Sequence, residues 1–136
     1  MTAAGRPVRD PATQPWPGVA LRILLGGGVI AGIAWWGDVR AGLPLAIAAG
    51  IASAALWALP ATPGDTVHPR GILRVPGRLR LTLDVALILL AATAIWTAGS
   101  RAASETLLTT ALIHAALTHD RIRWLARAAA KPGHLG

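Results

Sequence analysis

Arg78 to Thr97 reads RLRLTLDVALILLAATAIWT and is the most informative stretch of this chain. Asp84 is the only charged residue between Leu81 and Ala98. At 1.5 Å per residue, about 18 apolar residues in a helix cross the roughly 30 Å hydrocarbon layer of a bilayer. The stretch therefore predicts a membrane-spanning helix over residues 79–98.

The acid inside this helix is expected to need a partner. The apolar side chains of the stretch together favour insertion by about 2.5–5 kcal/mol, whereas an Asp at the bilayer centre costs roughly 2.5–3.5 kcal/mol. An unpartnered Asp84 would therefore cancel most of the favourable term. Arg80 precedes Asp84 by four residues, so both side chains lie on the same face of the helix.

The composition places the whole chain in the membrane class. Its 136 residues have a mean hydropathy of +0.53, and 54% of them are apolar. Charged residues make up 14%, compared with about 25% in soluble domains. The chain has no cysteine, which excludes disulfides, thiolate metal sites and cysteine nucleophiles.

The basic residues are distributed in an alternating pattern. The net charge is +7, and eleven of the thirteen lysines and arginines fall at the N-terminal end, in and beside the middle loop, or at the C-terminal end. Arg40 and Arg101 lie in the other two connections. This alternation is the positive-inside pattern of four spans with both termini cytoplasmic. It favours contact with anionic lipid at the cytoplasmic face and argues against binding to nucleic acid.

We therefore predict an all-α fold, an integral membrane four-helix bundle in the bacterial inner membrane. The membrane domain covers residues 18–127, with a flexible cytoplasmic tail at 1–17 and a C-terminal tail at 128–136. Very short outer connections are expected at 37–40 and 99–103, and the last helix is expected to continue unbroken past the membrane to Leu125. Trp57 is expected at the inner membrane boundary. The predicted spans are about 19–36, 41–59, 79–98 and 102–119.

Small residues recur every four positions on the first two spans, which lets neighbouring helix backbones approach closely. Two interpretations remain open for these surfaces. They can pack against other helices of the same bundle, or they can form contacts in a homo-oligomer or with a membrane partner protein. The helix-packing residues so identified are Gly28, Gly32, Gly42, Ala46, Gly50 and Ala54.

Polar side chains on three different spans are predicted to lie at one depth. Counting residues from the cytoplasmic ends places Arg22, Asp84 and His114 within roughly 6–9 Å of the inner surface. With Arg80 they form a candidate intramembrane polar cluster. The cluster is interpreted either as a clasp that compensates buried charges or as a proton or cation site.

No enzyme signature is present in the sequence. The serines lack a nucleophile-elbow context, no phosphate-binding glycine loop follows a strand, and His114 and His119 are spaced so that they lie on different helix faces. We therefore expect no catalytic residues, no metal site and no cofactor.

The order and spacing of several features resemble the YrdB-like family, small four-span bacterial membrane proteins of unknown function. The features are Arg22 early in the first span, Trp57 followed by prolines that close the second, and Asp84 after a proline and an arginine in the third. His114 ahead of Asp120 and Arg121 is similar to the end of the fourth span in actinobacterial members. The resemblance covers about residues 21–125 and implies a four-span fold but no activity. The family often has a second acid where this chain has Gly26.

Two functions follow as alternatives. The first is a structural or accessory membrane protein that packs through its small-residue helix faces. The second is a small proton- or cation-coupled transporter that uses Asp84. The size and the four spans resemble small multidrug exporters, but those carry their membrane acid in the first span, where this chain has none. An intramembrane enzyme is disfavoured because no nucleophile–base pair appears.

Overall fold

The computed structural model describes residues 16–62 and 72–127, and most of these residues are helical. The predicted all-α class is confirmed. The tail residues 1–15 and 128–136 and the loop residues 63–71 lie outside the described part of the chain. The elements are α1 (Trp16–Ala41), α2 (Leu43–Ala58), β1 (Pro60–Ala61), β2 (Leu73–Arg74), α3 (Gly77–Thr97), α4 (Arg101–Leu117) and α5 (His119–Arg127).

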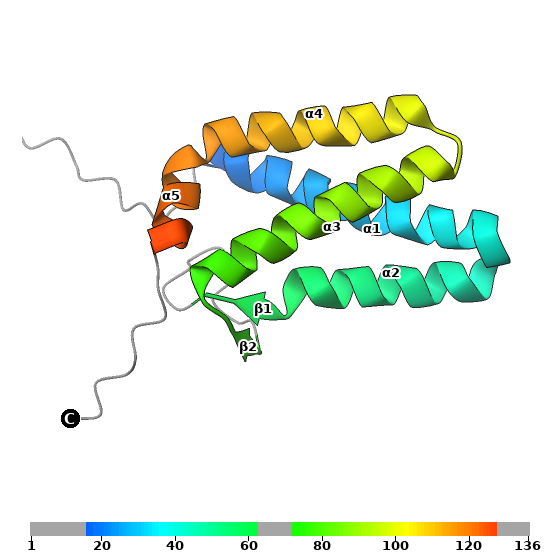
Figure 1. The fold of residues 1–136 in the computed structure, drawn as a ribbon, viewed down its shortest axis with the longest axis horizontal. Coiled ribbons are helices and arrows are strands. Elements are labelled where there is room, and N and C mark those ends of the chain that lie inside the picture. The colour runs from blue at the N-terminus through cyan, green and yellow to red at the C-terminus, as the bar shows by residue number, and fades with distance from the viewer. Residues whose placement is uncertain (1–15, 63–71, 128–136) are drawn as a thin grey trace, which may run out of the picture.

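The four long helices run alternately in opposite directions along one axis, and α5 lies across one end of them (Figure 1). α1 packs against α2, α3 and α4, and α3 packs against α4 and α5. The start of α1, the end of α2 and the start of α3 therefore meet at the end where α5 lies. The turns from α1 to α2 and from α3 to α4 occupy the opposite end.

The first connection is shorter than predicted. Residues 37–40 were expected to form the turn, but they continue α1, and Gly42 alone separates the two helices. Gly42 has a φ of 75°, a left-handed conformation that favours glycine. The tight turn brings the backbones of α1 and α2 together. A Cβ added at Gly37 would lie only 2.8 Å from the Leu45 carbonyl oxygen. At the other end of α1, Trp16 and Pro17 belong to the helix and not to the predicted tail.

The predicted unbroken helix at the end of the chain is wrong. α4 ends at Leu117, and Thr118 adopts φ −115° and ψ 20°, which is not helical. The chain then turns, and α5 docks on the beginning of α3. Arg78 Nε donates a hydrogen bond of 2.8 Å to the Ala126 carbonyl, and Gly77 lies against the Leu125 backbone so closely that no Cβ would fit.

A minimal parallel strand pair ties the ends of the middle loop together. Leu73 N donates to Leu59 O at 3.1 Å, and Val75 N donates to Ala61 O at 2.8 Å. These bonds hold the end of α2 beside Pro76, which immediately precedes α3. The pairing therefore fixes where the charged first turns of α3 lie.

The apolar core joins α1, α2, α3 and α4. Leu25, Val29 and Ile33 of α1 meet Trp57 of α2, Leu87 and Ile95 of α3, and Leu107 of α4. α1 and α3 are long and apolar enough to cross a membrane by length and composition, and α2 is a shorter apolar helix. Only 39% of the apolar window of α1 and 33% of that of α3 are buried inside the bundle. Most of their residues are therefore partly or fully exposed at the surface of the bundle.

Candidate functional site

The site is built around Asp84, two turns into α3. Asp84 Oδ1 lies 3.2 Å from Nη2 of Arg80, and Oδ2 lies 3.5 Å from Nη1 of Arg22 on α1. The three residues are 8%, 1% and 4% exposed, respectively. Because each carboxylate oxygen faces a different arginine, this one acid holds α1 and α3 together.

Arg80 also binds the C-terminal end of α2. Its Nη1 donates to Pro60 O at 2.6 Å, and its Nη2 donates to Trp57 O at 2.9 Å. The last carbonyls of a helix have no partner within the helix and carry its negative dipole end, so a guanidinium there satisfies both. Arg80 therefore joins α2 to α3, and the loss of its side chain would leave buried carbonyls without these donors.

Trp57 supports the arginine of α1. The Arg22 guanidinium carbon lies 5.3 Å from the centre of the Trp57 ring, a cation–π distance. The ring in turn lies on Gly26, where an added Cβ would come within 2.8 Å of the indole nitrogen. Trp57 is 9% exposed and belongs to the apolar core, so its ring does not face outward as that of an interface anchor would. Its predicted depth at the inner membrane boundary stays a prediction.

His114 on α4 completes the set predicted from the sequence. It is half-buried and lies near Arg22, Asp84 and Arg121, close to the Gly18 backbone of α1. The structure thus brings together Arg22, Arg80, Asp84 and His114, from three helices, at one end of the bundle.

Arg121 was not included in the predicted cluster. It lies on α5 and is 4% exposed. A continuous helix would have carried it away from the bundle, but the break at Thr118 turns it back toward the other arginines. The one available signal was the basic, amphipathic pattern of residues 119–127, and that pattern predicts a surface helix equally well.

A cavity of about 360 Å³ lies beside the cluster, between α3 and α4. Its charged end is formed by Arg22, Asp84, His114 and Arg121. The rest of its lining is mainly apolar, and it includes Trp57 of α2. The site therefore combines a buried guanidinium-rich end with an apolar chamber.

The predicted small-residue faces lie mainly between helices of the same chain. A Cβ added at Gly28 would lie 3.2 Å from Leu107 of α4, and one added at Gly32 would lie 2.5 Å from Ile95 of α3. On α2, Ala46 contacts α1 at Gly37, Gly50 lies against α1, and Ala54 is half-buried. Gly42 is the link between α1 and α2. Packing inside one bundle accounts for Gly28, Gly32, Ala46 and Gly50.

Within residues 16–62 and 72–127, no group of three or more His, Asp or Glu side chains is placed to hold a metal ion. Comparisons with protein-family models, curated proteins and solved structures found no match. The resemblance to the YrdB-like family therefore stays a prediction, and function has to be argued from the geometry of the site and of the surface.

Proposed function

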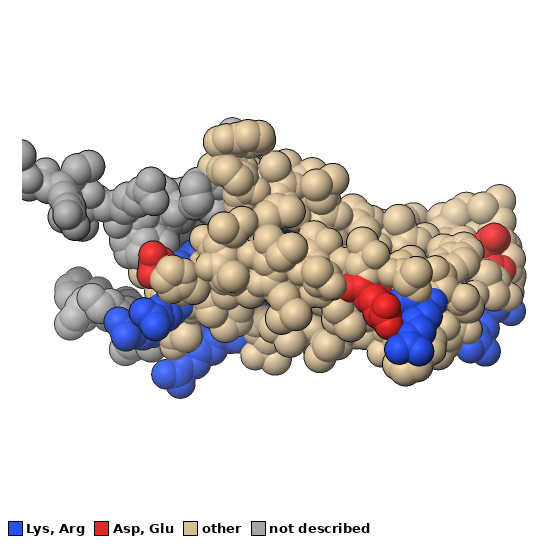
Figure 2. Space-filling model, turned by 90° about the horizontal axis from the view of Figure 1, so that it is seen from above, with Lys and Arg blue, Asp and Glu red and all other residues tan. Residues whose placement is uncertain are grey.

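We propose that this chain is a four-span protein of the bacterial plasma membrane, with both termini cytoplasmic, and that it acts as a structural or accessory subunit. The observation that carries the membrane location is the distribution of exposed charge. Among the described residues, exposed Asp, Glu, Lys and Arg side chains lie toward the two ends of the bundle, and one adjacent acid–base pair is set in from its end (Figure 2).

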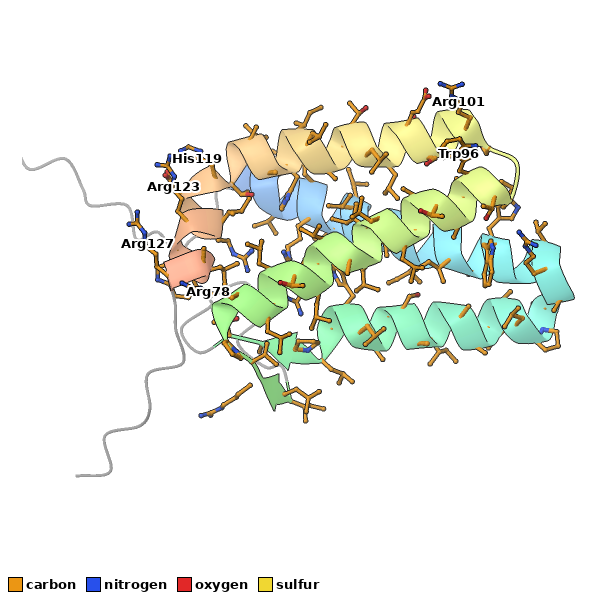
Figure 3. All side chains as sticks on the ribbon, viewed as in Figure 1. Arg78, Trp96, Arg101, His119, Arg123 and Arg127 are labelled. Carbon is orange, nitrogen blue, oxygen red and sulfur yellow. The ribbon has the colours of Figure 1, made fainter. Side chains whose placement is uncertain are left out.

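The two ends of the bundle differ in net charge. Figure 3 labels Arg78, Arg123 and Arg127 at one end and Arg101 toward the other. The basic end, where α5 lies, exposes Arg74, Arg78, Asp120, Arg123 and Arg127. The neutral end, where α1 turns into α2 and α3 into α4, exposes Asp38, Arg40, Arg101 and Glu105. Four cations against one acid at the basic end, and two against two at the neutral end, favour a cytoplasmic basic end.

Between these ends, all four long helices expose large apolar side chains. Examples are Leu24 of α1 at 67% exposed, Ile51 of α2 at 66%, Leu90 of α3 at 57% and Leu112 of α4 at 72%. An apolar surface on every side of a bundle would drive aggregation in water, whereas it is the normal surface of a protein in lipid.

Threonines in this apolar belt keep their hydroxyl groups bonded within their own helix. Thr93 donates to Leu89 O at 2.9 Å, and Thr106, Thr109 and Thr110 each donate to the carbonyl four residues earlier at 2.8 Å. A hydroxyl that is satisfied in this way costs less in hydrocarbon, where water cannot serve as its partner. The weaker hydrophobicity of α4 is therefore compatible with a place in the membrane.

The lengths of α2 and α4 can be compared with the thickness of the hydrocarbon layer. α2 has 16 residues and α4 has 17, which correspond to about 24 and 26 Å at 1.5 Å per residue. Both are a few ångströms short of a hydrocarbon layer of about 30 Å, a mismatch that local thinning accommodates at modest cost. Long neighbours α1 and α3 pack against these shorter helices on the inside of the bundle.

Cysteine labelling tests the location directly, because the chain has no cysteine of its own. Single variants Ile72→Cys at the basic end, Ala102→Cys at the neutral end and Leu112→Cys in the belt are treated with a membrane-impermeant maleimide. We expect Ala102→Cys to react in intact cells, Ile72→Cys only after the membrane is opened, and Leu112→Cys only after denaturation. Rapid labelling of Leu112→Cys in native membranes would contradict the proposal.

A structural role, as opposed to transport, is favoured by the closed geometry of the cluster. Asp84 is held by two arginines and its neighbour Arg80 is bonded to two carbonyls, an arrangement that locks helices together. Purification from native membranes in mild detergent, followed by mass measurement of the intact assembly, tests this role. We expect a homo-oligomer or a partner protein, and a strictly monomeric protein without partners would contradict it.

Transport is the second candidate, and the cavity that adjoins Asp84 and His114 favours it. A proton- or cation-coupled transporter would move ions across liposomes in response to a pH gradient. The flux would be lost in Asp84→Asn if that carboxylate carried the ion. Flux that is equal in wild type and in Asp84→Asn, or equal in wild type and in empty liposomes, removes this candidate.

A further inference from the structure

The cavity between α3 and α4 has features that a clasp does not need. Its charged end contains Arg22 and Arg121, each 4% exposed, together with Asp84. Arg80 lies directly behind Asp84. Among the described residues, the charged groups that line this end are two buried guanidinium groups, Arg22 and Arg121, and the carboxylate of Asp84. A guanidinium has five N–H donors in a planar fork that matches a phosphate or carboxylate, so this end of the cavity is suited to binding an anionic group.

The apolar part of the cavity extends away from the charged end along two turns of α3. From Leu81 to Leu89 the helix rises about 12 Å at 1.5 Å per residue. Val85, Leu89 and Leu112 line the cavity and are 49%, 54% and 72% exposed, so they form its rim on the outer surface of the bundle. The cavity therefore opens sideways into the apolar belt.

The volume limits what can enter. At about 360 Å³ the cavity lies near the lower end of small-molecule sites, which range over about 300–1,000 Å³. A cavity of this size has room for one acyl chain. It has no room for a bulky ring system that carries two acyl chains. A second cavity, of about 750 Å³ between α1 and α4, is lined by residues such as Leu24, Gly28 and Leu107, and no charged side chain lines it. Recognition of a charged head group therefore belongs to the first cavity.

We propose that the cavity between α3 and α4 binds an anionic amphiphile. One acyl chain lies between Val85, Leu89 and Leu112, and a phosphate or carboxylate head group lies at Arg22 and Arg121. The site rests on the proposed membrane location, because its side opening faces acyl chains only if the four helices span a bilayer. The ligand is either a phospholipid of the surrounding leaflet or a free single-chain amphiphile, which present the same chemistry.

The first test compares head groups on the wild-type protein. Delipidated protein in neutral detergent is titrated with phosphatidylglycerol or phosphatidylcholine, and the rise in Tm with lipid concentration gives an apparent Kd. Charge-assisted hydrogen bonds to the arginines predict at least about tenfold tighter binding of phosphatidylglycerol. Equal stabilisation by both lipids would overturn the proposal without any variant being needed.

The second test fills the cavity. Ala115 lines it, whereas Ala116, the next residue of α4, is exposed and lies outside the lining. Ala115→Leu is expected to abolish the stabilisation by phosphatidylglycerol, and Ala116→Leu is expected to retain it. If the two variants respond alike to phosphatidylglycerol, the ligand does not occupy this cavity.

Arg121→Gln addresses the head group, because it removes one guanidinium and leaves the Arg22–Asp84–Arg80 contacts in place. It should bring the apparent Kd values for the two phospholipids together. Titration with lysophosphatidylglycerol and palmitate identifies the source of the ligand. Tighter binding of phosphatidylglycerol than of either assigns a bilayer lipid, and the reverse order assigns a free amphiphile. Because binding is measured in detergent, its failure leaves the labelling result intact, and a contradictory labelling result removes the membrane location itself.

Discussion

The molecule contains two Arg–acid pairs of identical spacing in opposite environments. Arg80 and Asp84 on α3 lie 3.2 Å apart at the basic end, with side chains 1% and 11% exposed. Arg101 and Glu105 on α4 lie 2.7 Å apart at the neutral end, with side chains 79% and 61% exposed. The nitrogen–oxygen distance is shorter in the exposed pair, but the buried pair holds more helices in contact.

The difference shows that connectivity and burial decide what an ion pair does. Water and salt screen the exposed pair, and pairs of this kind contribute about 0–1 kcal/mol. The buried pair is joined to α1 through Arg22, and through two carbonyls to the end of α2 and the start of β1. If the acid is removed, several buried cations lose their counter-charge together.

The largest expected effect is that of Asp84→Asn, which tests the buried side of this comparison. Arg22 and Arg80 would remain buried without their carboxylate, and breaking a buried pair costs about 3–5 kcal/mol. The free energy of unfolding, measured in lipid bicelles at neutral pH, should fall by this amount. A variant as stable as wild type, or more stable, would mean that Asp84 is retained for function at the expense of folding, and transport would become the leading candidate.

A smaller effect is expected from Gly26→Ala, which tests whether the buried pair depends on its aromatic wall. The new methyl group would meet the indole of Trp57 at 2.8 Å and push it against Arg22. Overpacking of this kind costs about 1–3 kcal/mol.

Gly27→Ala is the matched control, because a Cβ at Gly27 has no other atom within 4 Å. It should leave stability unchanged or raise it by up to about 1 kcal/mol through helix propensity. Thermal unfolding of both variants in the same detergent compares them. Equal effects of Gly26→Ala and Gly27→Ala would show that Trp57 has room to move and does not hold Arg22 in place.

The smallest expected effect is that of Glu105→Gln, which tests the exposed side of the comparison. The loss should be at most about 1 kcal/mol, and it should shrink further as salt is raised because exposed charges are screened. The loss in Asp84→Asn should persist at the same salt concentrations. Unfolding measured at low and at high ionic strength checks both. A salt-resistant loss in Glu105→Gln would mean that the neutral end is also part of a buried interface.

The sequence by itself determined the all-α class, the approximate helix positions and the alternating distribution of charge. These properties depend on hydrophobicity and on chain position, which can be summed residue by residue without a fold. It also indicated that Arg22, Arg80, Asp84 and His114 share one depth, because depth follows from the constant rise of a helix.

Only the tertiary structure decided which side chains meet at that depth. The break at Thr118 returns Arg121 to the bundle, and the strand pair beside Pro76 places Arg80 on the end of α2. Trp57 faces Arg22 and Gly26 because α1 and α2 are joined through a single residue, Gly42. These outcomes depend on packing between segments far apart in the chain. Periodicity and spacing describe each helix alone, so they carry no information on such contacts.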